Sequence, residues 1–133
     1  MKKYLSHLAA AVYWNVPYIE SILCSEIAEA KEVDFTAVKG SKRYQIKGCS
    51  IHVCKARLPR GAIVIRDGEM IASPELMFLQ LAPRLDFHTL ILLGLQLCSH
   101  RPARPTHAIT SKKKLTSFLE KSSGHRGQSK ALR

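Results

Sequence analysis

The sequence predicts one α+β domain over residues 1–133: a small mixed or antiparallel sheet with a hairpin, packed against leucine-rich helices, with helical N- and C-terminal segments. Short stretches rich in β-branched residues lie in residues 33–72, and two nearly all-apolar stretches lie in residues 73–98. A chain of 133 residues suffices for one core but not for two ordinary domains. Two segments remain: residues 1–32, which we expect to be helical, and residues 99–133, which are basic.

Two short helices are expected near the N-terminus. Apolar residues from Leu5 to Tyr13 recur at helical spacing. Pro17 suits the first position of a second helix that runs through Leu23, because its ring fixes φ at a helical value. Trp14 then serves as a large apolar anchor at the corner between the two helices.

Four short strands follow in the prediction, over residues 33–38, 44–47, 50–54 and 62–66. Asp67-Gly68 separates the last of these from residues 69–72. A type I′ turn needs positive φ at both central residues, which Asp-Gly tolerates, so this pair predicts a hairpin.

Local capping signals predict the helices. Ser73 can accept a hydrogen bond from the first turn of a helix that ends near Pro83, and Asp86 can cap a second helix over residues 87–98. Neither helix has a polar face of useful width, so we expect both to be covered on two sides. Ser111 caps a third helix over residues 112–121, which Gly124 ends; a further helix begins at residue 128.

The cysteines do not indicate a metal site, and no cofactor is expected. Cys24, Cys49, Cys54 and Cys98 form no CxxC pair. A strand over residues 50–54 would put Cys49 and Cys54 on opposite faces, although His52 shares the face of Cys54. Reduced cysteines packed as small apolar residues explain the pattern better.

No motif for catalysis stands out. The sequence lacks GxGxxG, GxxxxGK[ST], HExxH and GxSxG, and its carboxylates lie mostly singly. A triad of Ser73, His52 and Asp67 can be imagined, but a cap and a turn account for the serine and the aspartate. We therefore expect a non-enzymatic binding protein without a small-molecule substrate.

The net charge of +11 is concentrated in two blocks. Residues 39–66 hold eight Lys/Arg and no acid, and residues 99–133 hold nine Lys/Arg and one Glu. Such blocks attract phosphate or an acidic protein surface, although a merely solvated face is the alternative. The candidate binding residues for nucleic acid or an acidic nucleoprotein partner are Lys39, Lys42, Arg43, Lys47, Lys55, Arg57, Arg60, Lys112, Lys113, Lys114, Arg126 and Lys130.

The mode of binding is expected to be non-specific. Tyr44 is the only aromatic residue of the first block, so stacking platforms for bases are lacking and phosphates would be the main contacts. No apolar run reaches the roughly 18 residues that span a bilayer, and no signal-peptide core is present, which favours a cytoplasmic protein without a membrane partner.

One stretch resembles a known family. Residues 58–75 read LPRGAIVIRDGEMIASPE, and after the leucine-rich stretches GHRG at residues 124–127 opens a basic helix. This order resembles the middle region of AbiEi-type antitoxins and of proteins that couple it to a very-short-patch-repair-like endonuclease domain. The resemblance covers roughly residues 33–133 and rests on the order of elements.

The resemblance implies a scaffold from bacterial defence or toxin–antitoxin modules, reduced to its non-catalytic part. Residues 1–32 are too short and not basic enough for the winged helix that commonly precedes this region, and no catalytic residue of the family has a counterpart here. We therefore expect a non-enzymatic basic binding protein of a defence, antitoxin or anti-defence system. The alternatives are the front half of a nuclease-family protein, a mobile-element inhibitor of a host CRISPR-type complex, and a homodimer formed through the leucine-rich helices.

Overall fold

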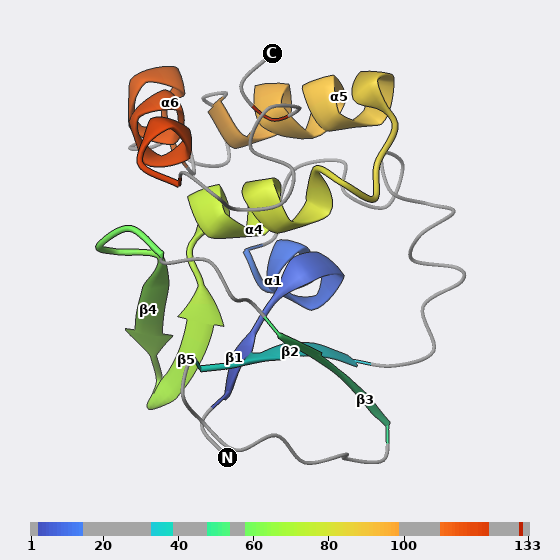
Figure 1. The fold of residues 1–133 in the computed structure, drawn as a ribbon, viewed down its shortest axis with the longest axis vertical. Helices are drawn as coiled ribbons and strands as arrows, with labels where there is room; N and C mark the ends of the chain where they lie inside the picture. Colours follow the sequence, from blue (N-terminus) through green and yellow to red (C-terminus); the bar gives the residue numbers. More distant parts are fainter. Residues whose placement is uncertain are drawn as a thin grey trace.

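The computed structural model describes residues 3–14, 33–38, 48–53, 58–98, 110–122 and 131. A five-stranded mixed sheet forms its base, with strand order β3-β2-β1-β5-β4 (Figure 1). Strand β1 pairs antiparallel with β2 and parallel with β5, while β2–β3 is parallel and β4–β5 antiparallel. The strands are β1 Lys3–Leu5, β2 Val33–Ala37, β3 Cys49–Val53, β4 Ile63–Arg66 and β5 Glu69–Ala72. The predicted α+β class is confirmed.

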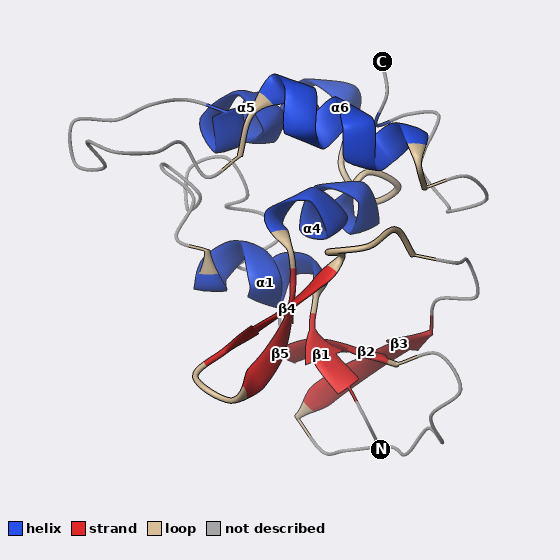
Figure 2. Cartoon of the chain, turned by 90° about the vertical axis from the view of Figure 1, so that its left-hand side faces the viewer, coloured by secondary structure: helices blue, strands red, loops and turns tan. Residues whose placement is uncertain are grey.

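The described helices lie on one side of this sheet. Helix α1 is next to the sheet, α4 lies above α1, and α5 and α6 form an outer layer beyond α4 (Figures 1 and 2). All eight residues of α4 are buried, because this helix has neighbours on both sides, as its composition predicts. The helices are α1 His7–Tyr13, α4 Pro74–Leu81, α5 Phe87–Cys98 and α6 Lys112–Glu120.

The hairpin and the helix caps follow the predictions. Asp67 and Gly68 have φ values of 51° and 78°, the positive values that the turn requires. Ser73, Asp86 and Ser111 each accept a hydrogen bond from the backbone N–H three residues further on, at 3.2, 2.7 and 3.1 Å. These features depend only on residues close in sequence, which is why the sequence predicts them.

The N-terminal prediction is wrong at its start. Residues Lys3–Leu5 form a strand, and the helix begins only at His7. Leu5 pairs with Phe35 on one side and with Ile71 on the other. Strand β1 thus lies between β2 and β5, and the backbone hydrogen bonds available on both edges outweigh the helical spacing of its apolar residues. The second helix, expected to run through Leu23, lies outside the described residues.

Within the described part of this chain, α5 is covered on one side only, so the expected cover by the N-terminal helices is wrong for this helix. Leu90, Leu93 and Leu97 are buried. On the same helix Phe87, Ile91 and Leu95 remain 46%, 43% and 57% exposed. This face is exposed because α5 lies in the outer layer, while the N-terminal helix α1 packs against α4.

Other predictions fall partly or wholly outside the described part of the chain. The strand expected over residues 50–54 is β3, Cys49–Val53, while Cys54, the strand over residues 44–47 and Gly124 are not described. Among the helices in the described ranges, none is long and apolar enough to cross a membrane.

Candidate anion-binding groove

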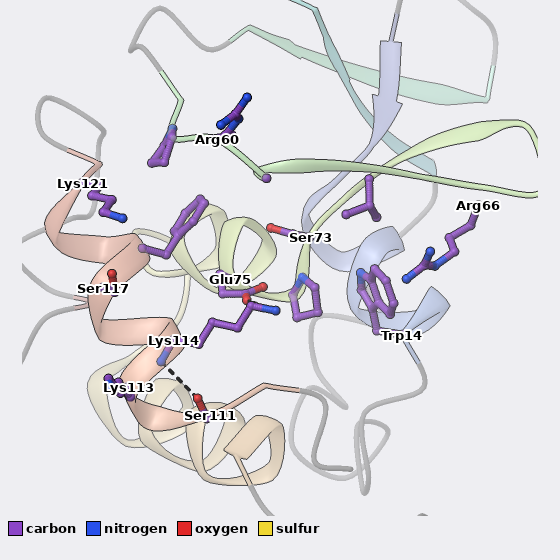
Figure 3. A pocket seen from close by; sticks show the side chains of 15 residues that line it. Trp14, Arg60, Arg66, Ser73, Glu75, Ser111, Lys113, Lys114, Ser117 and Lys121 are labelled. Atoms are coloured by element: carbon purple, nitrogen blue, oxygen red, sulfur yellow. Dashed lines mark hydrogen bonds and ion pairs between the residues drawn. The ribbon is translucent and has the colours of Figure 1, made fainter. Parts of the chain in front are cut away.

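A groove of about 690 Å³ opens beside the first turn of α4, between helix α6 and the region of α1 and the β4–β5 hairpin (Figure 3). We call it the basic groove. Its lining residues come from four stretches of the chain: Trp14; Pro59, Arg60, Gly61, Val64 and Arg66; Ser73, Pro74 and Glu75; and Ser111, Lys113, Lys114, Ser117, Phe118 and Lys121.

Positive charge dominates this lining. Five of these residues are basic and one, Glu75, is acidic. Arg60 and Arg66 belong to the first basic block of the sequence, and the lysines of α6 belong to the second. The fold therefore joins the two blocks at one concave surface, where like charges with few acids raise the local affinity for anions.

Helical periodicity selects which lysines of α6 reach the groove. Lys113, Ser117 and Lys121 are spaced four residues apart and line it together, as residues on one helix face do. Lys112 lies on another face. It lines a smaller, mainly apolar hollow of about 300 Å³, together with Leu90 and Ile91 of α5.

The carboxylate of Glu75 is buried below the lysines. Its side chain is 5% exposed, and its Oε1 lies 3.5 Å from Nζ of Lys114, whose own side chain is 72% exposed. The hydroxyl of Thr110 donates a hydrogen bond to the same Oε1, at 3.2 Å. Glu75 therefore holds Lys114 over the groove and offsets part of its charge, while Figure 3 shows the other basic side chains around the rim.

An aromatic surface adds to the charges. The indole N–H of Trp14 donates a 2.8 Å hydrogen bond to the backbone carbonyl of Ala72, and the ring of Tyr13 meets the indole edge-on at 5.3 Å. These contacts hold the indole of Trp14 at the side of the groove opposite α6 (Figure 3). Phe118 of α6 also lines the groove.

Three of the candidate residues from the sequence meet at this groove: Arg60, Lys113 and Lys114. Lys112 does not line it. Lys121, a further basic residue that the sequence places among the phosphate contacts of the last helices, lines the groove as well. Sequence reasoning missed Arg66 as a binding residue, although it lies inside the first basic block. It also missed Trp14, for which the sequence carries no signal, because only tertiary packing brings α1 here. The candidates Lys39, Lys42, Arg43, Lys47, Lys55, Arg57, Arg126 and Lys130 lie outside the described residues.

A second polar cluster lies where α1 meets strands β2 and β3. Nε2 of His52 is 2.9 Å from Oδ1 of Asp34, and the rings of His7 and His52 stack at 4.0 Å. Burial opposes the charged form of Asp34, but the hydrogen bond with His52 and the charges of His7, His52 and Arg84 outweigh it, so the pKa of this carboxyl lies below its usual range. Ser6, which accepts a 2.8 Å hydrogen bond from Thr36, is fully buried.

This cluster differs from the triad imagined from the sequence. His52 pairs with Asp34, while Ser73 caps α4 and Asp67 forms the hairpin turn. Within the described ranges, no group of three or more His, Cys, Asp or Glu side chains could hold a metal ion.

Burial, together with the charge of Glu75, raises the pKa of the Cys98 thiol, which favours its protonated form.

Comparison with known proteins finds no match to this chain, whether among family models, curated proteins or solved structures. The resemblance to AbiEi-type antitoxins and to endonuclease-associated proteins therefore stays a prediction.

Proposed function

We propose that this chain is a non-enzymatic binding protein that docks polyanions in the basic groove. The observation that supports it most is the meeting of the two basic blocks around one hollow, with five basic residues and one acid in its lining. Nucleic acid, or an acidic surface of a nucleoprotein complex, is the class of partner that such a surface attracts.

Helix orientation favours the same ligands. Ser73 and Ser111 cap α4 and α6, and both line the groove, so the positive ends of two helix dipoles lie beside it. Lys114 is engaged with Glu75, which leaves Arg60, Arg66, Lys113 and Lys121 as the four basic side chains proposed to hold phosphates. Four phosphate contacts predict a loss of about 50- to 150-fold in affinity between 50 and 200 mM salt.

The biological setting that we propose rests on the sequence resemblance. It is bacterial defence, with the chain acting in the cytoplasm as an antitoxin-like or anti-defence protein. Two alternatives stay open: the front half of a nuclease-family protein, and a mobile-element inhibitor of a CRISPR-type complex. Capture of partners from the native host, with and without nuclease treatment, separates a nucleic-acid partner from a protein partner.

A pair of charge reversals at the two ends of α6, its first residue Lys112 and its C-cap residue Lys121, tests the docking proposal. Lys121→Glu removes a positive charge from the groove, whereas Lys112→Glu makes the same formal change on another face. We expect Lys121→Glu to weaken binding of a fluorescent oligonucleotide at least tenfold and to flatten its salt dependence by about one to two phosphate contacts. Equal losses in the two variants would refute docking in the groove, because the effect would then follow net charge alone.

A second role, self-association, is favoured by helix α5. Phe87, Ile91 and Leu95 recur at four-residue spacing on its exposed face, and Phe87–Cys98 contains no Lys, Arg, Asp or Glu. Each copy carries a net charge of +11, but α5 itself contributes no like charges that would repel a second copy at this face. Sedimentation should show a dimer that persists in high salt and is lost in Ile91→Lys; a monomer at every salt concentration would exclude it.

A further inference from the structure

We infer that the basic groove binds single-stranded nucleic acid, with the indole of Trp14 as the stacking platform for an unpaired base. The inference rests on the proposed docking of polyanions and adds the kind of strand that docks. It differs from the sequence-based expectation, in which phosphates are the main contacts because aromatic residues are rare in the basic blocks.

Trp14 is suited to stacking because its position is set before a ligand arrives. It follows the last residue of α1, its N–H is bonded to the Ala72 carbonyl at 2.8 Å, and its ring packs edge-on against Tyr13. An aromatic ring that is already ordered loses little conformational entropy on binding. Stacking of a base on such a ring is tolerant of sequence, because every base has a π-face.

The charges around the groove fit a strand whose bases point inward. Figure 3 shows Trp14 and Arg66 on one side, the lysines of α6 on the other, and Glu75 between them. The buried carboxylate of Glu75 repels phosphate from the floor, while the basic residues attract it to the rim. A nucleotide strand meets both demands, since its charge lies on the backbone and its uncharged rings can enter the groove.

This arrangement argues against the two other polyanions. The bases of a duplex already stack on their neighbours, so Trp14 could take one only after it is unstacked. An acidic peptide would bring carboxylates towards Glu75, and its acidic side chains carry no ring that could stack on Trp14. The volume of about 690 Å³ lies within the roughly 300–1,000 Å³ of sites that hold drug-sized ligands, which is enough for a base with its sugar.

The chain contains one tryptophan, so its fluorescence reports on this position alone. The full chain is titrated with four probes: a short oligothymidylate, an abasic strand of equal length and charge, a duplex of equal length, and polyglutamate. We expect saturable quenching by oligothymidylate, and binding of the abasic strand that is roughly 5- to 150-fold weaker for each stacked base. The duplex should bind without quenching.

Two substitutions separate stacking from folding. Trp14→Leu keeps an apolar side chain but removes the ring, and should bring the affinity for oligothymidylate down to that for the abasic strand. Trp14→Phe restores a ring and should recover most of the difference, with anisotropy as the readout. If Trp14→Leu fails to fold, the comparison between oligothymidylate and the abasic strand in the unaltered protein still decides the question.

The outcomes distinguish the two proposals. Equal affinity for the abasic strand and oligothymidylate, without quenching, would overturn the stacking role and leave a groove that holds phosphates only. Polyglutamate binding as tight as that of oligothymidylate would overturn the choice of nucleic acid and favour an acidic protein. If no probe binds at low salt, docking of polyanions fails, and the stacking inference fails with it.

Discussion

Removing the one acidic residue that lines the basic groove should strengthen binding. Glu75→Gln keeps the size of the side chain and an oxygen that can accept the hydrogen bond from Thr110, but it abolishes the negative charge beside Lys114. Lys114 then loses its ion-pair partner and becomes a further contact for phosphate. The variant isolates charge, because shape and most of the hydrogen bonding are retained.

The size of the effect follows from the charges. One unit charge acting on a phosphate about 8 Å away contributes about 1 kcal/mol at an effective dielectric constant of about 40, which corresponds to roughly fivefold tighter binding. Stability should change in the opposite direction. Glu75 lies in the first turn of α4, where a carboxylate stabilises the helix dipole by about 0.3–1 kcal/mol, and its ion pair adds little because Lys114 is 72% exposed.

The assay is oligonucleotide binding by anisotropy, paired with chemical denaturation of the same samples. Glu120→Gln is the matched control, because Glu120 is an exposed acid of α6 that does not line the groove, so its affinity should stay within about twofold of the unaltered protein. The pKa of Cys98 should also fall in Glu75→Gln, since the charge of Glu75 helps to raise it. Unchanged or weaker oligonucleotide binding in Glu75→Gln would refute the placement of anions in this groove.

Three further predictions concern stability and the part of the first basic block that lies outside the described residues. Asp86→Ala should lower the free energy of unfolding by about 1 kcal/mol, because Asp86 caps α5, and should leave oligonucleotide binding unchanged; a binding defect would contradict a purely structural role. Asp34→Asn should destabilise the protein at neutral pH, where the ionised carboxyl pairs with His52. Because folding lowers the pKa of Asp34 from 3.8, its contribution is present above that pH and is lost as the pH falls through the lowered pKa. Denaturation curves of the variant and the unaltered protein should therefore converge in acid, and a constant difference would disprove this linkage. Combined charge reversal of Lys42, Arg43 and Lys47 in the first basic block should abolish binding without unfolding the domain, as judged by circular dichroism. Binding with an unchanged salt dependence would show that these three residues do not contact the ligand.

The sequence by itself determined the features that depend on neighbours along the chain. The Asp67-Gly68 hairpin and the caps at Ser73, Asp86 and Ser111 were predictable, because each needs only a turn conformation or a hydrogen bond reaching three residues ahead. The burial of α4 followed from its composition, and the α+β class followed from the change of periodicity near residues 33 and 73.

Tertiary structure alone decided how these elements meet. Strand β1 forms because β2 and β5 offer it two hydrogen-bonding edges, and α5 exposes Phe87 and Leu95 because of its place in the outer layer. The charge blocks were visible in the sequence, but their meeting at one groove, with Trp14 beside them, depends on contacts between distant segments. Charge and aromatic character belong to single residues, whereas the distances that turn them into a site are set by the packing of the whole chain.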